Sequence, residues 1–166
     1  MSHKMKFEIF LEVAKELNKS FNLVPILFGS LGLTRVINWD RAVNDIDFLV
    51  PKEFLKENWQ TLISLMENLG FTMIDEHEHE FVRSGESVAF GEEDDLKELA
   101  QVDPKNLRVA EVNGAKFREL SANQYLSVYT TFSRDQYRQE KRGKADQEKI
   151  AKIQEYLQKT RELNRS

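Results

Sequence analysis

Two stretches of the sequence decide the fold: Ile26-Leu27-Phe28-Gly29-Ser30 and Asp45-Ile46-Asp47-Phe48-Leu49-Val50. Each has the apolar character of a short buried strand, and the second begins with two acids at alternate positions. Because an extended strand points residues i and i+2 to the same face, Asp45 and Asp47 are expected side by side, roughly 7 Å apart at their Cα atoms. Ile46 and Phe48 would then point into the core.

Such a pair of acids indicates a cation. Two carboxylates this close repel each other unless a positive charge lies between them, and oxygen ligands suit Mg²⁺, usually together with phosphate oxygens and water. The turn Gly29-Ser30, which ends the preceding apolar run, offers backbone N–H groups and a hydroxyl that can hold a phosphate. The two stretches together predict a site for Mg²⁺ and a nucleoside triphosphate (NTP).

The composition is that of a soluble globular protein. The chain has 166 residues, of which 40% are hydrophobic and 31% charged, so a single domain over residues 1–166 is expected. No apolar stretch approaches 18 residues, which predicts no membrane span. The start of the chain lacks the apolar core of a signal peptide, and there is no cysteine. A cytoplasmic location is therefore the simplest expectation.

The charge is unevenly distributed along the chain. The net charge of −4 argues against a dedicated nucleic-acid binder. Residues 134–166 nevertheless hold ten Lys and Arg against six Asp and Glu, whereas residues 1–133 hold 14 against 22. The basic C-terminal segment could pair with the acidic body, hold a phosphate, or form a solvated helix.

The order of elements predicts an α+β fold, with helices packed on a mixed β-sheet. A core over about residues 1–120 is expected to precede a C-terminal helical segment over about 121–161. The hydrophobic spacing and turn residues predict these helices: 4–19, 31–37, one from Pro51 to Gly70, one from Ser121, and 137–161. They predict these strands: 23–28, 45–50, 71–75, 81–83, 87–90, 107–112 and 115–120.

The residues from Gly29-Ser30 to Arg41-Ala42-Val43-Asn44-Asp45-Ile46-Asp47 resemble the signature of the DNA polymerase β-like nucleotidyltransferase superfamily. They look most like bacterial minimal nucleotidyltransferases, which include aminoglycoside-type enzymes and toxin/antitoxin-type proteins. The stretch from Arg138 through Asp146 to Ile150 is similar to the helix that often closes such domains, although Lys149 stands where that helix has a second Asp. The resemblance covers most of the chain.

This resemblance implies a nucleotidyltransferase fold and a role for each matching residue. Gly29 and Ser30 would contact the triphosphate, while Asp45 and Asp47 would bind Mg²⁺ as the catalytic pair. Arg35 and Arg41 would be further nucleotide-binding residues. The implied reaction moves a nucleoside monophosphate from an NTP to an acceptor, which is a small molecule, a protein or an RNA end.

The sequence departs from the family pattern at the third carboxylate, which usually lies on a later strand. Alternation places Val88 and Phe90 in the core, so the expected acid falls at Ala89, which can neither bind metal nor accept a proton. The acids that could replace it are Glu86, Glu92 and Asp94. Alternatively, the protein is a catalytically silent nucleotide-binding or protein-interaction (antitoxin-like) module. A weaker third hypothesis is a structural domain whose acids bind nothing.

Two other features allow alternatives. Trp39, in a polar loop near the acidic strand, would be a lid residue or a core plug. His77 and His79 alternate as in a zinc-binding pair, but no third ligand is evident, so a solvated turn is expected. His79 could also point towards the nucleotide pocket.

Overall fold

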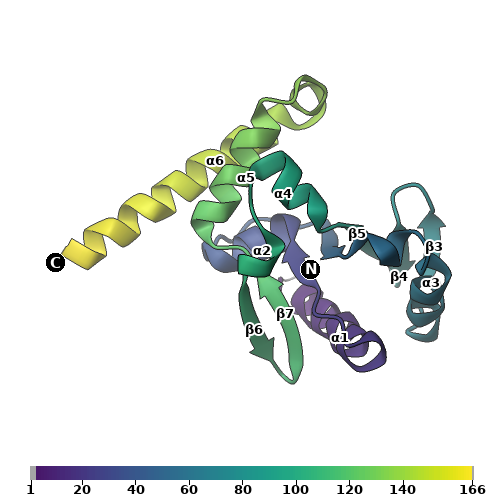
Figure 1. Ribbon diagram of the computed structural model, residues 1–166. Coiled ribbons are helices and arrows are strands. Elements are labelled where there is room, and N and C mark those ends of the chain that lie inside the picture. The colour runs from purple at the N-terminus through teal and green to yellow at the C-terminus, as the bar shows by residue number, and fades with distance from the viewer. Residues whose placement is uncertain (1–2, 166) are drawn as a thin grey trace.

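The structure is a computed structural model and describes residues 3–165 (Figure 1). Within these residues the strands form one seven-stranded sheet in the order β3-β4-β5-β2-β1-β7-β6. The strands are β1 (Ile26–Phe28), β2 (Asp45–Val50), β3 (Thr72–Asp75), β4 (Glu80–Arg83), β5 (Glu86–Glu92), β6 (Arg108–Val112) and β7 (Ala115–Glu119). The pairs β2–β5 and β1–β7 are parallel and the others antiparallel, which confirms the mixed sheet.

Helices cover both faces of this sheet, as expected for an α+β fold. The α-helices are α1 (His3–Phe21), α2 (Gly29–Val36), α3 (Trp59–Asn68), α4 (Asp94–Ala100), α5 (Ala122–Ser133) and α6 (Gln136–Arg165), and the 3₁₀ helices are η1 (Lys52–Leu55) and η2 (Pro104–Asn106). One core cluster joins α1 and α3 to one face of the sheet. A second joins α4, α5 and α6 to the other face. None of the described helices is both long and apolar enough to cross a membrane.

Strand β2 lies between the two core clusters and shows the expected alternation. Ile46 and Phe48 are fully buried in the cluster under α1, where the Phe48 ring lies 4.5 Å from that of Phe10. Leu49 belongs to the other cluster. Asp45 and Asp47 therefore face the side of α5 and α6. A slip of one residue would bury both acids among aromatic rings, so the apolar face fixes the register.

Most predicted elements differ from the structure by a few residues at their ends, and two of the differences have a clear physical cause. Strand β1 begins at Ile26 and not at residue 23, since Pro25 has no N–H to donate to a neighbouring strand. The single helix expected from Pro51 to Gly70 is split into η1 and α3. The break falls at Lys56, whose φ of −125° and ψ of −97° lie outside the helical region.

The C-terminal half of the fold follows the turn and cap signals of the sequence. Asn113 and Gly114 both have positive φ, as a two-residue hairpin turn requires, and they join β6 to β7. Ser121 and Gln124 form the expected capping box at the start of α5. Helix α6 follows, and Figure 1 shows its C-terminal end projecting beyond the body of the protein.

Candidate nucleotide and metal site

The turn between β1 and α2 touches the acidic strand. Phe28 pairs with Asp47 across the two strands, and Gly29, the first residue of α2, has a φ of +70° that favours glycine. A Cβ atom at Gly29 would come closer than 3.0 Å to Asp47 Oδ2, a separation that real Cβ atoms essentially never show. The glycine therefore lets the N-terminus of α2 approach the carboxylate. Backbone N–H groups at such a helix start attract anions.

The turn and the acids open into one cavity of about 680 Å³. This volume lies within the usual range for small-molecule sites. Five of the six residues that the sequence predicts for the site line it: Gly29, Ser30, Arg41, Asp45 and Asp47. The structure thus brings together residues from β1, α2, β2 and the loop before β2.

Asp47 is the most perturbed acid of this cavity. It is half-buried, and its carboxylate makes no hydrogen bond or ion pair with the described part of the chain. Burial, followed by the charge of Asp45, raises its pKa to about 6. The positive charges of Lys149 and Arg142 act in the opposite direction. A half-buried acid without a partner costs stability in the unbound protein, which is typical of binding sites.

Helix α6 supplies a basic wall opposite these acids. Arg138, Arg142, Ala145 and Lys149 all line the cavity, at a spacing that places them on one face of the helix. Burial and the neighbouring Arg41 charge lower the pKa of Lys149 to about 8. The sequence left the role of the basic segment open, and the structure places part of it at the cavity.

Arg138 is held in place by Asp146. Its Nε and one terminal nitrogen donate hydrogen bonds of 2.7 and 3.1 Å to the Asp146 carboxylate, which is fully buried. The guanidinium also lies 4.2 Å from the ring centroid of Phe132. Phe132 and Tyr129 line the same cavity and add an apolar surface to it.

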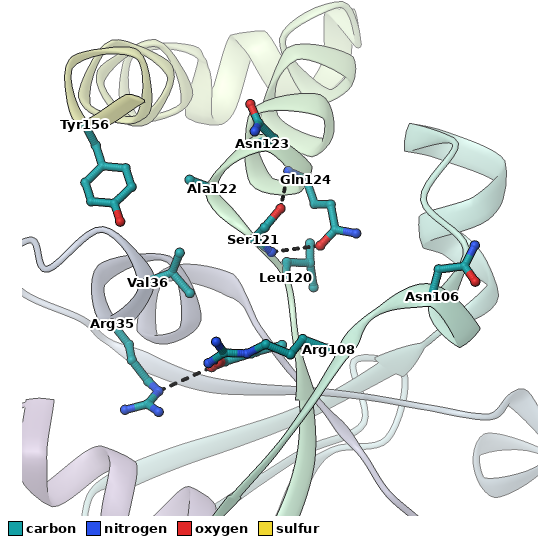
Figure 2. A pocket seen from close by; sticks show the side chains of 11 residues that line it. Arg35, Val36, Asn106, Arg108, Leu120, Ser121, Ala122, Asn123, Gln124 and Tyr156 are labelled. Atoms are coloured by element: carbon teal, nitrogen blue, oxygen red, sulfur yellow. Dashed lines mark hydrogen bonds and ion pairs between the residues drawn. The ribbon is translucent and has the colours of Figure 1, made fainter. Parts of the chain in front are cut away.

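Arg35 lies elsewhere, although the sequence groups it with the phosphate contacts. Its Nε is 3.4 Å from Glu119, which also pairs with Arg108, and its guanidinium stacks on Phe7 at 4.5 Å. Figure 2 shows Arg35 and Arg108 lining a separate cavity below the capping box of Ser121. The structure does not bring Arg35 to the Gly29-Ser30 turn.

The aromatic and histidine side chains near the site have other partners. Trp39 is half-buried, packs on the second core cluster and lies 5.3 Å below the Arg41 guanidinium, outside the acidic cavity. His77 is exposed in the β3–β4 turn, as expected. The His79 ring packs edge-on against Trp59, 4.8 Å away, and does not line the cavity.

The third carboxylate is absent from its expected place. Ala89 of β5 pairs directly with Asp47, and Val88 and Phe90 are buried, as the alternation predicts. Glu86 faces the other side of the sheet and is ion-paired with Lys6, and Glu92 pairs with Lys56 at 3.7 Å. Neither these two nor Asp94 lines the cavity. In residues 3–165, no three His, Asp or Glu side chains lie close enough together to hold a metal.

Sequence reasoning missed several acidic and basic residues of this cavity. The acids are Glu78, Glu80 and Asp95, and the bases are Arg138, Arg142 and Lys149. The sequence did contain a signal for the bases, because the spacing of Arg138, Arg142 and Lys149 places them on one face of a helix. A signal for Glu80 was present in the Ser84-Gly85 turn, which pairs residue 80 with residue 89.

Comparisons with known proteins agree with this architecture. No protein-family model matches the sequence. A crystal structure of an antigenic nucleotidyltransferase-like protein from Paracoccidioides brasiliensis superposes with a TM-score of 0.62, covering 92% of this chain and 77% of that one. At 14% identity this similarity shows a nucleotidyltransferase-like fold.

A bacterial relative is much closer in sequence. The uncharacterized protein YnaI of Bacillus subtilis is 41% identical over 141 residues, which cover 85% of this chain and 90% of YnaI. With that identity over nearly the full length of both proteins, the chain belongs to the same family as YnaI.

Proposed function

We propose that the protein is a Mg²⁺-dependent nucleotidyltransferase, which moves a nucleoside monophosphate from an NTP to an acceptor. One observation carries the proposal: the Gly29-Ser30 turn, the Asp45/Asp47 pair and the basic face of α6 line a single cavity. Helix N-termini and positive side chains bind phosphate groups, and carboxylates bind the accompanying cation.

The acidic pair fits Mg²⁺ in its donor chemistry. Asp45 and Asp47 lie on one face of β2, and Asp47 has no cationic partner within hydrogen-bond distance among the described residues. Mg²⁺ sites in phosphate-transferring proteins commonly use one or two carboxylates and take their other ligands from substrate phosphates and water. Asp45 and Asp47 would hold the ion, which would supply charge neutralisation and orient the α-phosphate.

The chain's own residues would then bind and orient the nucleotide. The N–H groups at the start of α2 and the Ser30 hydroxyl would donate to terminal phosphate oxygens, while Arg41, Arg142 and Lys149 would neutralise the triphosphate. The acceptor oxygen would bond to the α-phosphorus as the α–β phosphoanhydride bond breaks, releasing pyrophosphate. The acceptor, a small molecule, a protein or an RNA end, would release its proton to solvent in this step. A bacterial and cytoplasmic setting belongs to the same proposal.

Calorimetric titration of each NTP, with and without Mg²⁺, tests the proposal. We expect Mg²⁺-dependent binding by the full chain and its loss in Asp47→Asn. Asp40→Asn, a change of an exposed acid outside the cavity, is the matched control and should bind as the original protein does. Transfer of label from an α-labelled NTP to a panel of acceptors, or to the protein itself, then tests the reaction. Absence of any metal-dependent NTP binding would contradict the proposal.

A second candidate function is a catalytically silent nucleotide-binding or protein-interaction module of the antitoxin-like kind. The observation that favours it is Ala89, which pairs with Asp47 where a third carboxylate is expected. Loss of a general base typically costs about 10²–10⁴ in rate. Metal-dependent NTP binding without any labelled product would favour this candidate.

A further inference from the structure

Glu80 lies in the same cross-strand row as the acidic pair. Asp47 on β2 pairs with Ala89 on β5, and Ala89 pairs in turn with Glu80 on β4. Directly paired residues of neighbouring strands point to the same face of a sheet. Asp47, Ala89 and Glu80 therefore all face the cavity, which all three line.

The Glu80 side chain contacts β5, the strand that lies between it and the acids. Ser87 Oγ on β5 donates a hydrogen bond of 2.6 Å to Glu80 Oε1, and Ser87 itself pairs with Asp45 on β2. The Glu80 carboxylate thus reaches a side chain of β5, the one strand that lies between β4 and β2, where each strand spacing is about 4.8 Å. A side chain larger than the Ala89 methyl would stand in its way.

We propose that Glu80 supplies, from β4 and across Ala89, the third carboxylate for the cation held by Asp45 and Asp47. The inference rests on the proposed function and names a residue that completes its metal site. In this protein the third acid lies one strand further from Asp47 than the family pattern places it. Ala89, which pairs with Asp47, has a small side chain, and Glu80, which pairs with Ala89, has the long acidic one.

Two other acids line the cavity but are placed less well. Glu78 is exposed in the turn before β4, and Asp95 is exposed in the first turn of α4. Neither belongs to the row of Asp47. Glu80 is half-buried, and its carboxylate is oriented by Ser87. Since no three described His, Asp or Glu side chains are close enough to hold a metal as they lie, Glu80 turns from Ser87 towards the aspartates when the cation binds.

The test measures Mn²⁺ affinity by electron paramagnetic resonance on the full chain, with a non-hydrolysable NTP analogue present. We expect Glu80→Gln to weaken Mn²⁺ binding at least tenfold, since loss of even an outer-shell partner costs about 10–100-fold. Combining Glu80→Gln with Ala89→Asp moves the acid to the neighbouring strand and should restore the affinity. Glu76→Gln, an exposed acid of the same hairpin outside the cavity, is the charge-matched control.

Ser87→Ala separates a metal-binding role from a structural one. If Glu80 acted only through its hydrogen bond to Ser87, Glu80→Gln would keep the affinity, because the amide oxygen still accepts from the Ser87 hydroxyl, and Ser87→Ala would lower it. We expect Ser87→Ala to stay within about threefold of the original protein, because Glu80 leaves Ser87 when the cation binds and the bound state has no such hydrogen bond to lose. Glu80→Gln binding Mn²⁺ as well as the original protein would overturn the inference and leave the proposed function intact. If the original protein bound no Mn²⁺ and Asp47→Asn changed nothing, both would fail.

Discussion

Gly29 and Asp47 share one small volume at the end of β1, where the glycine hydrogen faces the carboxylate and a methyl group would overlap it. This contact joins the helix N-terminus that would hold phosphate to the acid that would hold the cation. The N-terminus of α2 and the Asp47 carboxylate can therefore lie this close only because Gly29 has no side chain.

Replacing Gly29 by alanine should displace the N-terminus of α2 and the Asp47 carboxylate together. An alanine at the positive φ of Gly29 costs about 1 kcal/mol of stability, and its methyl group would also collide with Asp47. We therefore expect Gly29→Ala to lose more stability than the φ penalty alone. We also expect it to lose Mg²⁺-dependent NTP binding. Gly85→Ala is the matched control, because Gly85 has a similar φ of +79° but no atom within 4 Å of its Cβ position. Urea denaturation and calorimetry measure both effects. Equal losses in the two variants would show that the collision with Asp47 is unimportant.

The sequence predicts the sheet around this contact well, because strong local signals mark its elements. The alternation in residues 45–50, the Asn113-Gly114 turn and the Ser121 capping box each act within a few residues, and each is found as expected. Boundaries were harder. The break at Lys56 depends on how η1 and α3 pack against the sheet, which a helical periodicity does not reveal.

The candidate site could be predicted where its residues lie in β1 and β2 or close to them in the sequence. Asp45, Asp47 and Gly29 are fixed by the pairing of β1 with β2. Arg35 lies outside the cavity, because its side chain leaves α2 towards Glu119, and only the fold shows this direction. Lys149 is more than 100 residues from Asp45, and its arrival at the cavity depends on the packing of α5 and α6.

Removing the charge of Asp47 should stabilise the unbound protein at neutral pH. Its pKa is raised from 3.8 to about 6, so the folded state binds more protons than the unfolded state between these values. The free energy of unfolding therefore falls as pH rises through this window, and the full penalty is present above pH 6. We expect Asp47→Asn to gain roughly 1–3 kcal/mol at pH 7.5 and little at pH 4.

Urea denaturation at the two pH values measures this gain. Asp40→Asn should change stability by less than about 0.5 kcal/mol at both, since Asp40 is exposed. A destabilised Asp47→Asn at pH 7.5 would mean that the carboxylate has a favourable partner in the unbound protein.

Breaking the Arg138–Asp146 pair should lower the free energy of unfolding of the protein. Arg138→Ala leaves the fully buried Asp146 carboxylate without its two hydrogen bonds, which typically costs about 3–5 kcal/mol. Arg134→Ala removes an exposed arginine from the end of α5 and should cost less than about 0.5 kcal/mol. Thermal and urea unfolding measure both. If the double variant Arg138→Ala/Asp146→Ala were no more stable than Arg138→Ala, the unpaired carboxylate would not be the cause.

Nucleotide affinity should fall as pH rises through about 8, because Lys149 loses its proton there. Burial and the Arg41 charge lower its pKa from 10.5 to about 8, so the ammonium available to a phosphate disappears above that pH. If binding needs the positive charge of Lys149, the affinity should drop by up to about tenfold for each pH unit above the pKa of Lys149 in the unbound protein. Calorimetric titration of Mg²⁺-NTP from pH 7 to 9.5 measures the slope.

Two substitutions assign this slope to Lys149. Lys149→Arg keeps the positive charge throughout the range, so the affinity should become nearly independent of pH between 7 and 9.5. Lys152→Gln removes a lysine of the same helix outside the acidic cavity and should retain the original slope. A pH dependence that persists in Lys149→Arg would place the titrating group elsewhere and remove Lys149 from the proposed phosphate contacts.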